Sequence, residues 1–148
     1  MFLRRFAIAL SIAAWIAGSA TPFAAMDGLE ITIVVDNLRS ARGQVRIALW
    51  SGPDGFADGD AAIVKAGQPA RPGAVRFTIP GLAPGRSAVA GYHDENGNGK
   101  FDRTWIGLPD EGLGFSNGAW IGFGPPAFDE AAVEISETDR VIVVTLRY

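Results

Sequence analysis

The sequence predicts an all-β domain, namely an antiparallel β-sandwich of about seven strands with one short helix and a long loop rich in glycine and aromatic residues. Three observations favour this fold class. Apolar and polar residues alternate with a period of two in several short segments, which is typical of strands with one face toward a core. Glycine and proline, 19 and 9 of the 148 residues, recur between these segments as turn residues. No repeat of about 20–50 residues is present, which disfavours a solenoid or a propeller.

The first 25 residues precede the domain and have the features of a secretory signal peptide. Arg4 and Arg5 give a basic start, an apolar run covers 6–17, and small residues lead to two candidate cleavage positions, Ala20 and Ala25. The apolar run is too short and has the wrong flanks for a membrane span, although an uncleaved anchor is the alternative. We therefore expect a periplasmic or secreted protein, with no membrane span after cleavage and a single domain over 26–148.

The composition excludes several classes of function. The chain has no cysteine, which excludes disulfides, thiolate metal sites and cysteine nucleophiles. Its formal charge is −3, and the leader holds two of the thirteen basic residues and none of the sixteen acidic ones, so that the remainder carries −5. An acidic domain without a basic stripe disfavours a nucleic-acid partner. A hydrophobic fraction of 48% excludes a disordered chain.

Alternating segments predict strands along the whole domain. In the first of them, Leu29, Ile31, Ile33 and Val35 alternate with mostly polar residues. The segments predicted as strands are 29–36, 44–49, 75–79, 86–93, 131–135 and 140–148. Short connections that contain glycine and proline supply the dihedral angles of tight turns.

The remaining elements are one helix and a terminal hairpin. A short helix is predicted at 60–66, with Asp60 as its N-cap and Gly67 just past its end. The last two strands are separated only by 137–139, which predicts a hairpin. Residues 141–144 are apolar on both faces, and this suits a central strand of a sheet.

Residues 94–128 are organised differently from the rest of the domain. They include few β-branched residues and are rich in glycine, asparagine, aspartate and aromatic residues. A loop of this length inside a compact domain is usually functional or packed by its own side chains. We therefore expect the functional site in this segment.

The start of this loop has the spacing of a calcium-binding turn. Oxygen-bearing side chains stand at loop positions 1, 3, 5 and 9, with Gly99 at position 6 and a backbone carbonyl at position 7. The predicted Ca²⁺ ligands are the side chains of Asp94, Asn96, Asn98 and Asp102 and the carbonyl of Lys100. Position 12 is Trp105 instead of a bidentate glutamate, so that Asp110 or Glu111 would supply the missing carboxylate. The alternative is a plain turn without metal, because Asn-Gly pairs favour positive φ.

His93 and Ser116 are the candidate catalytic residues. His93 is the single histidine and lies at a strand end beside Asp94 and Glu95. Such a histidine is more often a structural hydrogen-bonding group than a catalyst or a transition-metal ligand. The run 114–118 matches the G-x-S-x-G pattern of a nucleophile elbow, but a preceding strand, a following helix and a later histidine are missing. We therefore do not interpret Ser116 as a nucleophile.

Five aromatic residues follow in the long loop, and they allow two interpretations. The residues are Trp105, Phe115, Trp120, Phe123 and Phe128. They either form a platform for a sugar or a peptide, or they close the open end of the sandwich. Packing is the favoured interpretation because large aromatic side chains mostly contribute burial. An exposed patch of these rings would favour the platform instead.

Several runs of the mature chain resemble the bacterial domain-of-unknown-function (DUF) 2141 family. The matching segments are 43–46, 81–102, 107–112, 114–117 and 123–128, of which 93–102 is the most specific. Arg86-Ser87 departs from the pattern, since an aromatic residue is common after this Pro-Gly turn. The resemblance implies an exported β-sandwich, which is more remotely similar to transthyretin-like, immunoglobulin-like and carboxypeptidase-regulatory-like domains. It implies no activity, ligand or partner.

The sequence therefore predicts an exported, non-enzymatic binding or structural module in which Ca²⁺ orders the loop at 94–102. Its partner would be a protein or a glycan that meets the aromatic loop. Two alternatives remain. One is a small metal-dependent hydrolase that uses His93 and the neighbouring acids, and the other is an accessory domain without a small ligand.

Overall fold

Eight strands and three short helices form the described part of the chain, which in this computed structural model is residues 27–148 without 105, 108 and 121. In chain order they are β1 (Leu29–Leu38), β2 (Gln44–Trp50), the 3₁₀ helix η1 (Gly59–Ala61), β3 (Val64–Pro69), β4 (Gly73–Leu82), β5 (Gly85–Asp94), β6 (Leu113–Phe115), the 3₁₀ helix η2 (Ser116–Gly118), α1 (Phe128–Ala131), β7 (Val133–Ile135) and β8 (Val141–Thr145). The signal-peptide prediction for 1–25 lies outside the described residues.

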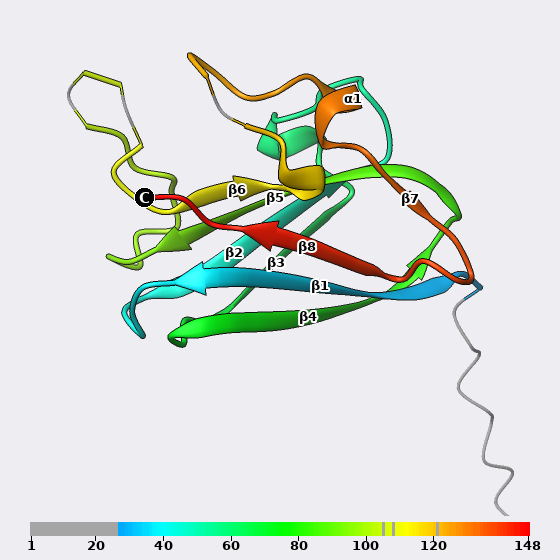
Figure 1. Cartoon of the computed structure of the whole chain (residues 1–148), viewed down its shortest axis with the longest axis horizontal. Helices are drawn as coiled ribbons and strands as arrows, with labels where there is room; N and C mark the ends of the chain where they lie inside the picture. Colours follow the sequence, from blue (N-terminus) through cyan, green and yellow to red (C-terminus); the bar gives the residue numbers. More distant parts are fainter. Residues whose placement is uncertain (1–26, 105, 108, 121) are drawn as a thin grey trace, which may run out of the picture.

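The strands form two sheets (Figure 1). A three-stranded sheet has the order β4-β1-β8, and a five-stranded sheet has the order β3-β2-β5-β6, with β7 paired to β5 as its fifth strand. Among the described strands every pairing is antiparallel except that of β1 with β8, which is parallel. The predicted all-β sandwich is thus confirmed, and its one short α-helix, α1, lies at a different place in the chain from the predicted helix.

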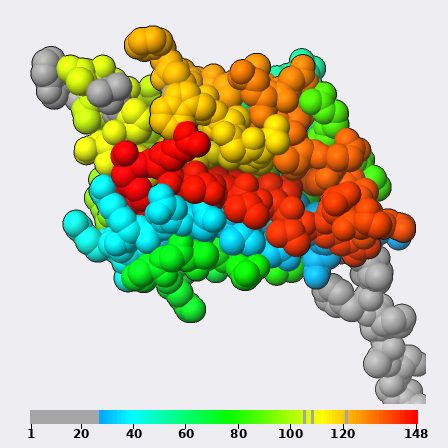
Figure 2. Space-filling view, viewed as in Figure 1, coloured from blue at the N-terminus to red at the C-terminus, as the bar shows by residue number. Residues whose placement is uncertain are grey.

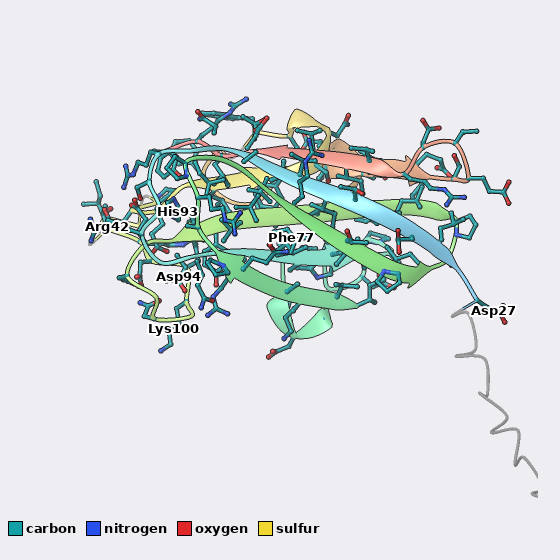
Figure 3. The ribbon with its side chains drawn as sticks, turned by 90° about the horizontal axis from the view of Figure 1, so that it is seen from below. Asp27, Arg42, Phe77, His93, Asp94 and Lys100 are labelled. Atoms are coloured by element: carbon teal, nitrogen blue, oxygen red, sulfur yellow. The ribbon has the colours of Figure 1, made fainter. Side chains whose placement is uncertain are left out.

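An apolar interior lies between the two sheets. The inward residues of β1 are fully buried, and Phe77 of the neighbouring strand β4 lies beside them, opposite Ile33 in the strand register, near the middle of the molecule (Figure 3). Val45, Ile47 and Leu49 of β2 and Val89 of β5 close this interior from the other sheet. Burial of each large apolar side chain stabilises the fold by about 1.5–3 kcal/mol. The same alternation leaves the intervening residues of each strand on the outer faces.

The prediction of a helix at 60–66 is wrong. Only a single 3₁₀ turn, η1, forms there, and its N-cap is Asp58, whose side chain accepts the backbone N–H of Asp60. Residues 64–69 instead form β3, which pairs antiparallel with β2 over its whole length, from Val64 opposite Leu49 to Pro69 opposite Gln44. Pairing with a neighbouring strand therefore overrides the local helix signals, which are weak in a segment this short.

Two predictions for the end of the chain are also wrong, namely that the last two strands form a hairpin and that the last strand is central in its sheet. β7 pairs with β5 and β8 pairs with β1, so that the connection 136–140 carries the chain from one sheet to the other. β8 is at the edge of its sheet, where Val141 and Val143 are 64% and 48% exposed on the outer face. An apolar run on both faces does not require burial on both faces, because valine also suits an exposed strand surface through its β propensity.

No helix in the described part of the chain is long and apolar enough to cross a membrane. The segments that leave the sandwich are instead the loops between strands. The longest of them joins β5 to β6 and projects at one end of the molecule, beside the segment that leads to α1 (Figure 1). These two segments define the surroundings of the candidate site.

Candidate functional site

The acidic turn at 94–102 begins with a carboxylate that is fully buried. Asp94 is the last residue of β5, and Arg46 of the neighbouring strand donates from Nε to its Oδ2 at 3.0 Å. The backbone N–H of Gly99 donates to the same oxygen at 2.9 Å, and that of Asn98 donates to Oδ1 at 3.1 Å. A buried carboxylate is tolerated only when it is paired in this way. Asp94 therefore holds the turn to the sheet.

The side chains of Asn96, Asn98 and Asp102 complete the turn. The Oδ1 atom of each asparagine accepts the backbone N–H of the residue two positions later. Asn96 accepts from Asn98 at 3.0 Å, and Asn98 accepts from Lys100 at 2.8 Å. Each donates its amide to Asp102 Oδ2, at 2.5 and 2.7 Å. Positive φ angles at Gly97 and Gly99 permit the tight winding. The structure thus brings all five predicted ligands into one hydrogen-bonded turn, with Lys100 at its outer end (Figure 3).

Glu111 returns to this turn from later in the loop, as the sequence allowed for Asp110 or Glu111. Its side chain is buried, with Oε1 accepting the backbone N–H of Glu95 and Oε2 that of Asp102, both at 3.1 Å. Burial raises the pKa of Glu111 above its usual range, against the two hydrogen bonds, and the charges of Asp102 and Asp94 raise it further. An excess of negative charge is therefore concentrated at this end of the sheet.

The donor chemistry of the turn is that of a hard cation. Its side-chain and carbonyl donors are all oxygens, which suits Ca²⁺ better than a transition metal. Within the described residues, however, no group of three or more His, Cys, Asp or Glu residues that could hold a metal ion is present. The predicted set contains only two carboxylates, Asp94 and Asp102, and the other donors are amide and carbonyl oxygens. Any ion here would be held mainly by neutral oxygens.

His93 is a structural residue at the same end of the molecule (Figure 3). It is fully buried, and both ring nitrogens are within 2.7 Å of an oxygen: Nε2 of the Arg42 carbonyl and Nδ1 of the Tyr148 hydroxyl. Because a carbonyl only accepts, Nε2 carries the proton and Nδ1 accepts from Tyr148. His93 therefore fixes the C-terminal residue, which follows β8, against the other sheet.

Glu95 lies next to this pair and forms an ion pair at the surface. Arg39 donates to its carboxylate through Nε and Nη2, and Ser40 donates at 3.0 Å. These hydrogen bonds lower the pKa of Glu95 to about 2, against the effect of partial burial. The Arg39 guanidinium also lies 4.2 Å from the centre of the Tyr148 ring. The acids beside His93 are thus engaged with cations and backbone groups.

A groove crosses the outer face of the five-stranded sheet. It encloses about 980 Å³ and is bounded by β2, β3, β5 and β6 together with parts of the loops at 99–109 and 122–125. Strand register places its floor residues in two rows. One row is Gly67, Arg46, Tyr92 and Leu113, and the next is Lys65, Ala48, Ala90 and Phe115. Small side chains in the centre of the second row make the hollow, with larger ones around it.

The aromatic residues divide between the two interpretations. Phe115 and Phe128 are buried on this outer face and meet Phe56 edge to face, at ring-centre distances of 6.1 and 5.6 Å. Trp120 is 63% exposed and Phe123 is fully exposed. Trp105 lies outside the described residues. Packing is therefore the role of the first two rings, whereas Trp120 and Phe123 remain at the surface beside the groove.

Ser116 belongs to the packed part of this face. It is fully buried, accepts the backbone N–H of Val89 at 2.8 Å and donates to the carbonyl of Ala131 at 2.5 Å. Its hydroxyl thus ties η2 to β5 and to the end of α1. The G-x-S-x-G run therefore has a structural explanation in this fold.

Sequence reasoning missed the residues that form the groove. Arg46 and Ala48 stand at outward positions of β2, whose strand the sequence predicted, and Ala90 and Tyr92 stand opposite them at outward positions of β5. A signal was present, because two alanines at positions that usually carry polar residues indicate a covered or hollow surface. Lys65 was missed because its segment was predicted as a helix.

The fold and the candidate site define an all-β sandwich protein with a ligand-sized groove on one outer face. A family model described as "Uncharacterized protein conserved in bacteria (DUF2141)" matches residues 33–143. The chain therefore belongs to this family, as its sequence resemblance indicated. No curated protein and no solved structure matches the chain. The more remote likeness to transthyretin-like domains stays a prediction.

Proposed function

We propose that the protein is an exported, non-enzymatic binding module that holds its ligand in the groove and takes up Ca²⁺ in the adjacent acidic turn. The observation that carries this proposal is the groove itself. Its volume of about 980 Å³ is at the upper end of the range of ligand sites, about 300–1,000 Å³. Its lining combines aromatic and small side chains with a few charged ones, which is the usual composition of such sites.

The position of the groove supports binding rather than a packing defect. Its floor is the outward face of β2 and β5, the two most extensively paired strands of the five-stranded sheet. Backbone hydrogen bonds on both sides of these strands keep the floor rigid. Arg46 is fixed by Asp94 at the same time, so that a charged group is already oriented at the edge of the groove.

The acidic turn supports the calcium part of the proposal through its unused oxygen lone pairs. An amide oxygen has two lone pairs, and those of Asn96 and Asn98 each accept one backbone N–H. Asp102 receives its two amide donors on Oδ2 alone in these contacts. Oxygen ligation by neutral donors gives weak affinity, which is common among extracellular calcium modules.

The hydrolase alternative receives less support from the surroundings of His93. Both of its ring nitrogens are engaged at 2.7 Å, and the residue is not among those that line either of the two hollows beside β6. A general base needs access to its substrate. We therefore favour binding over hydrolysis for this protein.

Matched substitutions on the two outer faces test the binding proposal. Ala48→Trp fills the floor of the groove, and Thr78→Trp adds the same side chain at an exposed position of β4 on the other face. The protein with its own leader is expressed, purified and screened on arrays of oligosaccharides and peptides. We expect a ligand that the native protein and Thr78→Trp retain and Ala48→Trp loses. Absence of any ligand, or equal retention by both variants, would contradict the proposal.

Calorimetry with CaCl₂ tests the acidic turn. We expect binding at millimolar or lower Ca²⁺ and an increased melting temperature, because an ion that binds only the folded state stabilises it. Asp102→Asn should lose this response, whereas Asp129→Asn, which removes an exposed carboxylate on α1, should keep it. A protein that shows no heat of binding at millimolar Ca²⁺ would refute the calcium part and leave the groove proposal intact.

A further inference from the structure

We propose that the groove binds an acidic oligosaccharide, that is, a chain of sugar rings that carry carboxylates. This inference rests on the proposed binding function and names the class of its ligand. The shape of the groove, its aromatic side chains and its charge suit such a ligand. The floor strands, which are paired on both sides, favour a sugar over a peptide.

The shape of the groove suits flat rings in a row. Ala48 and Ala90 are directly opposite each other on β2 and β5, and they leave a low strip across the sheet. Arg46 and Trp50 flank Ala48 along β2, and the two lie about 13 Å apart because each residue advances a strand by about 3.3 Å. The strip is thus wide enough for a ring and is bounded on both sides by larger side chains.

A second hollow continues the first toward the C-terminal end of β8. It encloses about 500 Å³ and shares Leu113, Phe115 and Phe123 with the groove. Trp120 forms part of its lining and is held by Arg147, whose guanidinium lies 4.2 Å from the ring centre. Two connected hollows accommodate an extended chain better than a single small molecule.

Aromatic faces are available along this path. Tyr92 and Phe101 meet edge to face with ring centres 5.7 Å apart, and both line the groove. In an edge-to-face contact each ring keeps at least one face free of the other ring, and the apolar C–H groups of a sugar can pack on such a face. Phe123, fully exposed at the junction of the two hollows, adds a ring whose exposure is otherwise unexplained.

The charge of the groove is opposite to that of the protein. Among its described lining residues, Arg46, Lys65 and Arg103 are cationic, and the one acidic residue, Asp60, lies 3.9 Å from Lys65, so that Arg46 and Arg103 have no acidic partner within the lining itself. The domain as a whole carries −5, so that this local excess of positive charge favours an anionic ligand. Arg46 is the best placed of the three. Its Nε donates to Asp94, and its side chain is still 35% exposed, so that its remaining N–H groups can bind a carboxylate.

The floor of the groove favours a sugar over an acidic peptide. Extended peptides bind sheets by adding a strand at an edge, where backbone N–H and C=O groups are free. In this groove the floor strands β2 and β5 are each paired on both sides, to β3 and β5 and to β2 and β6 respectively. A sugar is recognised through side chains instead, and the groove offers these.

A matched pair of ligands tests the inference by calorimetry. Tetragalacturonate carries one carboxylate on each ring, and its methyl ester has the same rings without the charge. Both are titrated in EDTA, so that Ca²⁺ ions do not bridge protein and sugar. We expect the acid to bind at least about tenfold more tightly than the ester, since several charge-assisted contacts are lost in the ester. Added salt should weaken the binding of the acid.

Charge-removing variants locate the binding site. Lys65→Gln and Arg103→Gln alter exposed side chains, and we expect each to weaken the binding of tetragalacturonate by about threefold to fivefold. Arg46→Gln should weaken binding more strongly, but it also removes the partner of buried Asp94. If this variant does not fold, the variants at Lys65 and Arg103 still test the inference. Arg76→Gln is the control, because it removes an exposed arginine on the opposite face. Equal weakening by the control would overturn the inference.

The outcomes separate this inference from the proposed function. Equal affinity for acid and ester, with loss of both in Ala48→Trp, refutes the acidic ligand and retains the groove as a binding site. A peptide that binds the groove in the array while both sugars fail also refutes the inference alone. If no array ligand and neither sugar binds, the inference and the proposed binding function are both wrong.

Discussion

The two outer faces of the sandwich are built from strands with the same alternation, yet in the described part of the chain α1, η2 and the long loops lie over the face of the five-stranded sheet. Figure 2 shows the other face, where β8 lies open at the surface beside β1. There Val141 and Val143 are exposed, whereas on the covered face Phe115, at an outward position of β6, and Phe128 of α1 are buried. The chain between β5 and β7 makes this difference, because it returns across only one sheet.

The groove lies where the cover of the five-stranded sheet is incomplete. On the covered face, α1 and η2 are packed by aromatic side chains over one part of the sheet. Next to that part, Ala48 and Ala90 form the centre of the floor between larger side chains, and the groove remains. On the open face, among the residues that the structure describes, Val141 and Val143 of β8 are exposed at the surface. Four predictions test how the two faces differ.

The largest expected effect concerns the cover. Phe115→Ala should lower the free energy of unfolding by about 3–4 kcal/mol, because it leaves a cavity between β6 and Phe56. Val143→Ala on the open face should change it by about 0.5 kcal/mol or less, since a half-exposed valine has few contacts to lose. Urea denaturation measures both variants. Similar losses for the two would mean that the cover contributes no more than the open face.

The second prediction concerns the buried carboxylate below the groove. Asp94→Asn should destabilise the fold by about 3 kcal/mol, because an amide cannot accept from Arg46 and two backbone N–H groups at once. Asp129→Asn breaks an ion pair in which both partners are exposed, and it should cost about 0.5 kcal/mol or less. Thermal melting at neutral pH distinguishes them. If the melting temperature of Asp94→Asn differed from that of the native protein by only about 1–2 °C, the role assigned to Asp94 would be contradicted.

The third prediction concerns the contact between the two sheets at the C-terminal residue. Tyr148→Phe removes the hydroxyl that donates to buried His93, and we expect a loss of about 1–2 kcal/mol. Tyr92→Phe removes a hydroxyl on the groove side that is 3.4 Å from the Gly99 carbonyl, a long hydrogen bond, so this variant should be nearly neutral. Denaturation curves of the two variants give the comparison. The reverse order would show that His93 does not depend on Tyr148.

The smallest effect is a pH dependence at the acidic end of the five-stranded sheet. The pKa of Glu95 is about 2 in the folded protein because of Arg39, and it is higher in the unfolded chain. Its contribution is therefore complete above about pH 4.5 and is lost as the pH falls toward 2. We expect about 1 kcal/mol, because Arg39 is half exposed and solvent screens the pair.

A double comparison checks the pH prediction. Glu95→Gln should flatten the fall in stability between pH 4.5 and 2, and Glu30→Gln, at an exposed position of β1 near the open face, should leave it unchanged. Glu111 acts in the opposite direction. Burial raises its pKa, so that its ionisation destabilises the folded state as the pH rises above the usual carboxyl range. If Glu95→Gln lost stability between pH 4.5 and 2 as strongly as the native protein, the assignment of this pH dependence to Glu95 would be contradicted.

Elements whose information is local could be predicted from the sequence. The alternation in β1, β2 and β4 predicted strands and their inward residues, since a period of two reports directly on which side chains share a face, and a strand was also predicted for β5. The spacing at 94–102 predicted one compact turn that includes Asp94 and Asp102, and the structure forms it. Family membership was also readable from the sequence, because the runs that carry it are continuous.

Only the tertiary structure decided what depends on distant partners. Residues 64–69 became a strand because β2 offers it a complete set of backbone partners, and β8 became an edge strand because it pairs with β1 instead of β7. The groove exists because four strands place Ala48 and Ala90 side by side under loops from elsewhere in the chain. Periodicity shows which residues face outward, but it does not show which outer face another segment will cover.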